Sequence, residues 1–290
     1  MIRIGIVGAE NSHSAAIAKT LNVQGSVPGF RVVAIWGETK AFAEKTAKIG
    51  KIPRIVRRPA DMVGDIDAAI VDHRHAKYHL PAAGALLAAK LPMFIDKPFC
   101  YRLAQGKAFL ARARRMKVPV TSFSTVPTSK CFAAFAKKVK KAGKALSAAS
   151  FGPCDLKSPY GGIFFYGIHQ VDMLMSLFGP EVRAVSVSSA RSGGDAVATL
   201  FWADGMTASL HCVREHSIGF QASVATGSGP LSARLVSDPN PYLAGVRIFT
   251  RMFKTRKEPV AHSRILAPVA VLEALEKSVK TGKLVAVAKV

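Results

Sequence analysis

The first 121 residues alternate short apolar runs with longer helical segments, and this alternation restricts the fold more than any other feature of the chain. Strands that alternate with helices of this length pair in parallel through right-handed crossovers. The run Asp67–Val71 is apolar without alternation, as expected of a strand buried on both faces. The sequence therefore predicts an α/β fold with a doubly wound parallel sheet. The expected strands are Ile2–Val7, Arg31–Trp36, Ala68–Val71, Pro92–Ile95 and Pro119–Thr121, and the expected helices are Ser14–Leu21, Lys40–Ile49, Ala76–Lys90 and Leu103–Met116.

The pattern changes after Ser122, where helices give way to consecutive strand-like runs. Such runs, with a turn at residues 203–205, predict an α+β domain whose open sheet is predominantly antiparallel. We place the boundary near residue 121, which divides the chain into domains at 1–121 and 122–290. The expected helices are Ser129–Lys141, Gly162–Phe178 and Ile265–Lys280, and the expected strands are Ala145–Phe151, Val182–Ala190, Ala196–Trp202, Met206–Val213 and Gly219–Ala225.

The chain is strongly basic, with a net charge of +23 from 41 Lys and Arg against 18 Asp and Glu. Clustered cations can bind nucleic acid by releasing counterions. No recognised nucleic-acid motif accompanies them, and only 8% of the residues are aromatic. We therefore interpret the charge as a solvated basic surface and do not expect a nucleic-acid partner.

Cysteine spacing and hydropathy indicate where the protein acts. The four cysteines are scattered without close pairing, which predicts reduced thiols and a cytoplasmic location. The longest apolar stretch, Leu80–Ala89, is too short to cross a bilayer, so no membrane association is expected.

The turn after the first strand, residues 8–13, has the position of a pyrophosphate-binding turn in a Rossmann domain. Of the three glycines in that fingerprint only Gly8 is present, and Glu10 stands where the backbone should approach the pyrophosphate. A purely structural turn is the alternative. The candidate cofactor residues here are Gly8, Glu10, Asn11, Ser12 and His13, of which Asn11 and Ser12 are also favourable helix N-caps.

Two further strand ends carry candidate cofactor residues. Gly37 and Glu38 follow the second strand, where an acid would accept hydrogen bonds from the adenosine ribose of NAD, while Lys40 could meet the extra phosphate of NADP. The choice between the two cofactors stays open. The loop after Val71 adds Asp72, His73 and His79. Its histidines lack matched metal-ligand spacing, so no metal is expected.

The segment Pro92–Pro98 is an apolar strand that runs directly into Asp96, Lys97 and Pro98. Pro98 cannot continue a strand and disfavours helical geometry at the residue before it. Lys97 is therefore expected at the carboxyl end of a strand, where open α/β sheets bind their ligands.

His169 and Asp172 fall in the expected helix Gly162–Phe178, three positions apart and thus on one face. An imidazole beside a carboxylate can be oriented and can exchange a proton near neutral pH. A hydrogen-bonded core histidine is the alternative.

At these residues the chain resembles the Gfo/Idh/MocA family, named for glucose-fructose oxidoreductase, inositol dehydrogenase and a rhizopine-catabolism protein. Asp96-Lys97-Pro98 is similar to the family's Glu-Lys-Pro triplet, and Gly167, His169 and Asp172 match its Asp-x-Gly-x-His-x-x-Asp helix. The segment 67–79 resembles the third core strand and its loop, and Asp204-Gly205 also recurs in the family. Phe165 stands where the helix motif has its first aspartate, one turn before His169 on the same expected face.

The resemblance implies a Rossmann domain bound to NAD or NADP, followed by a substrate domain. It implies hydride transfer between the nicotinamide and a hydroxyl or carbonyl carbon of a sugar, polyol or related carbohydrate. Lys97 would polarise the hydroxyl and help to hold the cofactor together with Asp96 and Pro98, His169 would be the general acid/base, and Asp172 would support the site. Family members associate through the second domain's sheet, so a homo-oligomer, a dimer, is expected. The alternative is a catalytically degenerate member that serves as a ligand-binding or assembly module.

Overall fold

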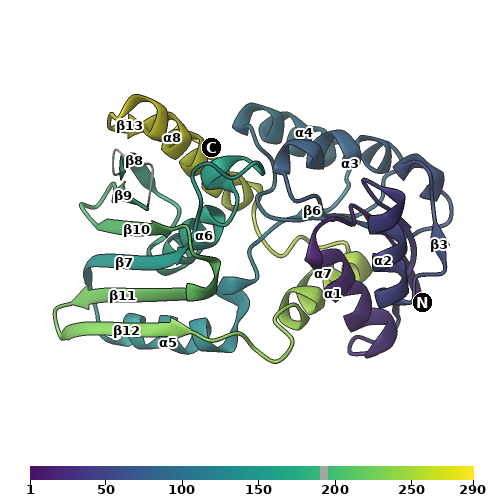
Figure 1. Ribbon diagram of the computed structural model, residues 1–290, viewed down its shortest axis with the longest axis horizontal. Helices are drawn as coiled ribbons and strands as arrows, with labels where there is room; N and C mark the ends of the chain where they lie inside the picture. Colours follow the sequence, from purple (N-terminus) through teal and green to yellow (C-terminus); the bar gives the residue numbers. More distant parts are fainter. Residues whose placement is uncertain (190–194) are drawn as a thin grey trace. The chain divides into compact units, whose positions relative to one another are not determined.

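The computed structural model describes residues 1–189 and 195–290, which form two compact units (Figure 1). The first unit comprises residues 1–100, 104–123 and 242–265, and the second comprises 101–103, 124–241 and 266–290. The return of residues 242–265 to the first unit is not anticipated by the sequence analysis. The expected strand Val182–Ala190 ends at Ser189, and Ala190 lies outside the described residues.

The sheet of the first unit is entirely parallel, with strand order β3-β2-β1-β4-β5-β6. The predicted doubly wound α/β sheet is confirmed. The direction of winding reverses between β1 and β4, which makes the carboxyl ends of these strands the topological switch point where ligands bind. The strands are β1 (Ile2–Val7), β2 (Phe30–Trp36), β3 (Arg54–Ile55), β4 (Ala68–Val71), β5 (Met93–Ile95) and β6 (Val120–Thr121).

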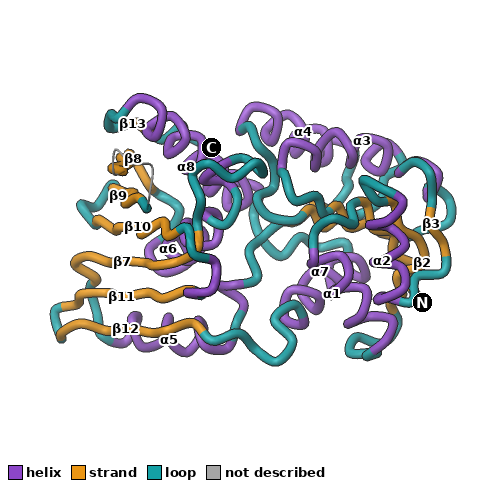
Figure 2. Tube along the Cα trace, in the orientation of Figure 1, coloured by secondary structure: helices purple, strands orange, loops and turns teal. Residues whose placement is uncertain are grey.

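Helices cover both faces of this sheet, with α3 and α4 on one side and α1, α2 and α7 on the other (Figure 2). All four residues of β4 are buried, as its unbroken apolar sequence predicts. Phe249 of α7 stacks on Phe94 of β5 with ring centroids 4.6 Å apart. The helices are α1 (Ser12–Ala18), continued by the π-helical turn η1 (Lys19–Val23), α2 (Lys40–Gly50), α3 (His79–Ala88), α4 (Leu103–Arg115) and α7 (Leu243–Thr255).

The second unit contains a seven-stranded sheet of order β12-β11-β7-β10-β9-β8-β13. Among the described strands of this sheet, only β7 and β10 pair in parallel, so the predicted antiparallel character is confirmed. The strand β12 has no counterpart among the sequence predictions. The strands are β7 (Ala145–Pro153), β8 (Val182–Ser189), β9 (Ala196–Trp202), β10 (Thr207–Val213), β11 (Phe220–Thr226), β12 (Gly229–Leu235) and β13 (Val285–Ala286).

One face of this sheet carries the core of the second unit. Alternate residues such as Leu200 and Leu210 are fully buried against the helices, while Thr199, Ser209 and His211 point to the other face and are partly exposed. This period of two is what a half-covered sheet requires. The helices on the covered face are α5 (Lys130–Lys141), α6 (Gly167–Phe178) and α8 (His262–Thr281).

All four cysteines are free thiols, and three of them are buried. Across residues 1–189 and 195–290, no helix has the combined length and apolarity needed to cross a bilayer.

Candidate active site

The carboxyl ends of β1, β4 and β5 bring the predicted residues of the first unit into one hydrogen-bonded cluster. Asn11 donates from Nδ2 to Asp72 Oδ1 at 2.6 Å and to Asp96 Oδ2 at 3.2 Å. His13 Nδ1 lies 3.0 Å from the same Asp96 oxygen. Asn11 occupies the expected N-cap position of α1, but its side chain makes no capping hydrogen bond. It binds the two carboxyl groups instead, while Ser12 is the exposed first residue of the helix.

The two carboxyl groups have opposite pKa shifts. Burial, followed by repulsion from Asp96, raises the pKa of Asp72 well above its usual value of 3.8. Burial works in the same direction on Asp96, but attraction to His13 and Lys97 outweighs it and holds the pKa of Asp96 below its usual range. These opposite shifts favour the ionised form of Asp96 and the protonated form of Asp72.

The hydrogen bonds of Ser14 agree with a protonated Asp72. Ser14 Oγ lies 2.8 Å from the Gly8 carbonyl oxygen and 2.6 Å from Asp72 Oδ2. A hydroxyl carries one proton and can donate to only one of these acceptors. When Ser14 donates to Gly8, protonated Asp72 can donate to Ser14 Oγ, so both contacts of this hydroxyl are hydrogen bonds.

The same cluster has donor atoms spaced closely enough for a metal, because one atom each from His13, Asp72 and Asp96 lies within 4.8 Å of the others. Two features favour the hydrogen-bonded network over a bound cation. Asn11 already donates to both carboxyl groups, and Lys97 Nζ lies 3.8 Å from Asp96 Oδ2. A cation would have to displace one positive and one hydrogen-bonded group.

Glycine is required at position 8 because β1 and β4 end so close together. Gly8 has φ +112°, and an added Cβ would lie 2.2 Å from the Asp72 carbonyl oxygen. Gly37 serves a similar purpose after β2, since a Cβ there would lie 2.8 Å from the Cβ of Ala9. The predicted turn is therefore held against the ends of its two neighbouring strands.

Glu38 holds this turn from the end of β2. Its Oε2 accepts the backbone N–H groups of Ala9 and Glu10 at 2.8 and 2.9 Å. Its Oε1 is buried and has no hydrogen-bond partner among the described residues. The Glu10 side chain forms an ion pair with Arg74, with Oε1 3.9 Å from Nη1. Arg74 thus offsets the negative charge that Glu10 adds to the turn.

The loop after β4 is held through its histidines. The ring nitrogens of His79 lie 2.9 Å from the His73 carbonyl oxygen and 3.0 Å from that of Pro98, so the ring ties this loop to the one after β5. Burial lowers the pKa of His79, and burial with the neighbouring His79 lowers that of His73 to about 3. His73 is therefore neutral at physiological pH.

Lys97 lies directly after β5, as predicted, and is only 8% exposed. Its ammonium is 3.8 Å from the ionised Asp96. A buried cation needs such a partner, because an unpaired charge is costly to remove from water. The sequence Asp-Lys-Pro thus places one cation, with its counter-charge, at the carboxyl edge of the sheet.

The second unit holds His169 by its Nδ1 atom. This nitrogen lies 2.8 Å from Ser124 Oγ, and Ser124 is 2% exposed. The Ser124 backbone N–H donates to Asp172 Oδ2 at 3.1 Å. His169 and Asp172 are both buried in α6, as expected, and Asp172 supports the residue that contacts the imidazole.

The expected place of Phe165 on the helix face is wrong. Helix α6 begins at Gly167, and Phe165 precedes it with extended backbone angles of φ −80° and ψ 120°. Tyr166, with φ +67°, separates the two segments. The Phe165 ring packs against Tyr160 and Tyr166, with centroids 5.0 and 4.7 Å apart. Position 165 is therefore one end of an aromatic group beside His169 rather than part of its helix.

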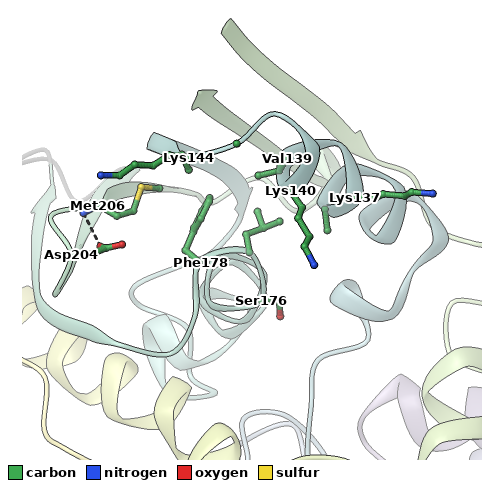
Figure 3. Close-up of a pocket in the computed structure, with 12 residues that line it drawn as sticks. Lys137, Val139, Lys140, Lys144, Ser176, Phe178, Asp204 and Met206 are labelled. Carbon is green, nitrogen blue, oxygen red and sulfur yellow. Dashed lines mark hydrogen bonds between the residues drawn. The ribbon is translucent and has the colours of Figure 1, made fainter. Parts of the chain in front are cut away.

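A separate cavity of about 620 Å³ in the second unit lies between α5 and the end of α6 (Figure 3). Lys137, Lys140 and Lys144 line it together with the apolar side chains of Val139 and Phe178. Lysines near the carboxyl end of α5 complement the helix dipole. The positive charge that these lysines bring to the cavity is thus explained by their favourable interaction with the helix dipole.

Comparison with known proteins identifies the first unit. Residues 2–124 match the GFO_IDH_MocA family, described as an oxidoreductase family with an NAD-binding Rossmann fold. This segment is thus similar to the Gfo/Idh/MocA family over residues 2–124. An uncharacterized oxidoreductase of this kind, YhhX from Escherichia coli K12, is 29% identical over 129 residues. That alignment covers 41% of the chain and 37% of YhhX.

Solved structures extend the likeness in fold to both units. Myo-inositol 2-dehydrogenase from Lactobacillus plantarum is 17% identical with a TM-score of 0.87, covering 99% of each chain. Scyllo-inositol dehydrogenase from Lactobacillus casei, solved with NAD(H) and scyllo-inositol, is 16% identical with a TM-score of 0.85, again covering 99% of each chain. The predicted Gfo/Idh/MocA resemblance and fold class are confirmed, and the family's NAD-binding description agrees with the expected cofactor, NAD or NADP.

Sequence reasoning missed three polar residues that the structure places in these clusters. Ser14, Arg74 and Ser124 contact Asp72, Glu10 and His169, respectively. Ser124 follows the end of β6 by three residues. The rule that site residues follow the carboxyl ends of parallel strands could have singled it out.

Proposed function

We propose that this protein is an NAD-dependent oxidoreductase that transfers a hydride between the nicotinamide and a hydroxyl-bearing carbon of a sugar, polyol or related carbohydrate. The observation that carries the proposal is the buried Lys97, placed with its counter-ion at the carboxyl end of β5 beside the switch point. A Lys ammonium there can donate a hydrogen bond to a substrate hydroxyl and stabilise negative charge on its oxygen.

The residues of the first unit fit a dinucleotide. Glu38 Oε1 is a buried acceptor that has no partner in the described part of the chain, and it follows β2, where the ribose of NAD presents its hydroxyl groups. The residues proposed to hold the cofactor are Gly8, Glu10, Asn11, Ser12, His13, Gly37, Glu38, Asp72, His73, His79, Asp96, Lys97 and Pro98. The cofactor, when bound, supplies the hydride acceptor or donor.

Glu38 also favours NAD over NADP. A 2′-phosphate would meet a carboxylate whose other oxygen is already committed to Ala9 and Glu10. Lys40, the residue that could have received that phosphate, is exposed and lies 3.7 Å from Glu44. We therefore expect NADH to bind more tightly than NADPH.

His169 is proposed as the general acid/base, supported by Asp172. Its burial and its fixed Nδ1 atom support the role, since proton transfer needs an imidazole held in one orientation. Inositol dehydrogenases share this fold, which makes cyclic polyols the first substrates to test.

Titration of the purified protein with NADH and NADPH tests the proposal. We expect NADH to bind at micromolar concentration and NADPH more weakly, followed by turnover of at least one polyol in a screen that monitors NADH absorbance. If neither cofactor gives a fluorescence or calorimetric response at millimolar concentration, the proposal fails. The degenerate ligand-binding or assembly module would then be the better description.

We also propose a homodimer formed through the open face of the second unit's sheet. Phe151 and His211 stack there with centroids 4.1 Å apart, and Val197 is 37% exposed. Light scattering should give twice the chain mass for the wild type and a monomer for Val197→Arg. A monomeric wild type at micromolar concentration would contradict this.

A cytoplasmic location, consistent with the four free thiols, can be checked by cell fractionation.

A further inference from the structure

The departure at Phe165 raises a specific chemical question about His169. A neutral imidazole has two tautomers, and only one presents a basic Nε2 atom. A partner at Nδ1 normally decides which tautomer is present. In the helix motif that this chain resembles, a carboxylate precedes the histidine by four positions, and here that position is a phenyl ring outside the helix.

Ser124 occupies the Nδ1 side of the ring. Its Oγ lies 2.8 Å from Nδ1, a normal length for a hydrogen bond to a ring nitrogen. The same oxygen accepts the Val126 backbone N–H at 3.1 Å, and the Ser124 N–H donates to Asp172 Oδ2 at 3.1 Å. Ser124 is thus held by a backbone donor on one side and a carboxylate on the other.

We infer that Ser124 is the positioning residue of His169 and replaces the carboxylate of the family's helix motif with a neutral hydroxyl. This inference rests on the proposed function for its catalytic meaning, but the contact itself can be tested without turnover. Asp172 acts one step further away, because its carboxylate fixes the Ser124 backbone.

A hydroxyl suits a group that must gain and lose a proton. Ser124 Oγ has two lone pairs, of which one takes the Val126 N–H. The other can accept Nδ1–H, which leaves Nε2 as the basic nitrogen. In alcohol oxidation, His169 Nε2 would take the substrate's hydroxyl proton, and a bound nicotinamide would supply the hydride acceptor. Nδ1–H then remains bonded to Ser124 throughout.

The exchange of a carboxylate for a hydroxyl also changes the electrostatics. A carboxylate at Nδ1 would stabilise the imidazolium, whereas a hydroxyl adds no charge. Among the residues that the structure describes, titratable groups near the ring include Asp172 on α6 and Tyr166, with its ring 5.7 Å from that of His169. His216 contacts Tyr166 at 5.1 Å. Ser124→Asp should therefore move the His169 titration to higher pH.

The experiment compares Ser124→Ala with Ser124→Thr in the full chain labelled with ¹⁵N-histidine. Ring nitrogen shifts report which nitrogen carries the proton, and His169→Gln assigns the signals. In the wild type we expect one tautomer for neutral His169. Ser124→Ala should give averaged shifts, and Ser124→Thr, which keeps the hydroxyl, should restore the wild-type pattern.

Ser209→Ala is the matched control. Ser209 Oγ lies 3.3 Å from His211 Nε2 in the same unit, so this variant also removes a hydroxyl next to a histidine ring. It should change the His211 signals and leave those of His169 unchanged. With an identified substrate, Ser124→Ala should lower kcat by roughly 10- to 100-fold with little change in KM, within the ~10²–10⁴ that general acid–base catalysis contributes.

Unchanged His169 shifts in a folded Ser124→Ala variant would overturn the inference, as would a failure of Ser124→Thr to restore them. Altered shifts without turnover of any polyol by the wild type would instead sustain the positioning contact and count against the proposed function. The two failures are therefore distinguishable.

Discussion

The polar clusters of the two units differ in how they are held together. In the first unit, Asp96 lies between His13 and Lys97, which lower its pKa, whereas burial and the charge of Asp96 raise the pKa of Asp72. In the second unit, His169 contacts the neutral hydroxyl of Ser124. A network of charges fixes the protonation of each member. A hydroxyl leaves the protonation of its partner free to change, which is what a proton-transferring group requires.

Removal of the central cation gives the largest expected effect. Lys97→Ala should lower turnover by at least about a hundredfold, because a donor aimed at the developing charge on the substrate oxygen is lost. NADH affinity should change only a few-fold. Lys45→Ala, which removes an exposed lysine from α2, is the control and should match the wild type. Steady-state kinetics and NADH titration measure both quantities, and retained turnover would remove Lys97 from the mechanism.

Glu38→Gln should weaken NADH binding by roughly 10- to 100-fold. The reason is the loss of a charged acceptor for a ribose hydroxyl, worth about 1.5–3 kcal/mol. NADPH binding should fall less, because repulsion of its phosphate is relieved at the same time. Glu44→Gln, which alters an exposed acid of α2, is the control. Equal losses for the two cofactors would show that Glu38 only holds the turn.

The smallest expected effect is a gain in stability for Asp72→Asn. The raised pKa of Asp72 means that the folded state binds an extra proton above pH 3.8, so folding stability falls as the pH rises toward the folded pKa. Asparagine removes this pH dependence and can donate to Ser14 as a protonated carboxyl does. The variant should therefore be more stable than the wild type at pH 8, and the difference should shrink as the pH falls toward 4. Urea unfolding from pH 4 to 8 measures the difference.

Asp67→Asn is the comparison for the urea unfolding of Asp72→Asn, because the pKa of Asp67 is shifted in the opposite direction. The hydrogen bond from Arg3 lowers the pKa of Asp67, so its contribution is present above pH 3.8 and is lost as the pH falls through the lowered pKa. The pair is exposed, and such pairs contribute only ~0–1 kcal/mol. A wild-type stability that rises from pH 4 to 8, with no difference from Asp72→Asn, would contradict a protonated Asp72.

The sequence predicts the first unit well because its signals are local. Unbroken apolar runs such as Ala68–Val71 mark buried parallel strands. Pro98 prevents β5 from continuing, which places Lys97 just beyond the carboxyl end of that strand. The grouping of Asn11, Asp72 and Asp96 then follows from parallel strands that share one edge. The sequence pattern does not predict the opposite pKa shifts of Asp72 and Asp96, because these depend on distances and burial.

The second unit is harder to predict at its site. The start of α6 depends on Tyr166 in a left-handed conformation, which no local pattern of a tyrosine indicates. The contact of Ser124 with His169 joins residues 45 positions apart. Both features arise from tertiary contacts, so the face of Phe165 is mispredicted and Ser124 is overlooked.

Helix α7 has a consequence for synthesis of the chain. Val246 and Phe249 are fully or almost fully buried in the core that β1, β4 and β5 share, yet they emerge from the ribosome after most of the second unit. The first unit therefore cannot complete its core until about residue 265 has been translated. We expect nascent chains stalled before residue 242 to remain protease-sensitive throughout their first 121 residues. A fragment that contains residues 1–123 joined directly to 242–265 would supply the missing cover and should resist digestion.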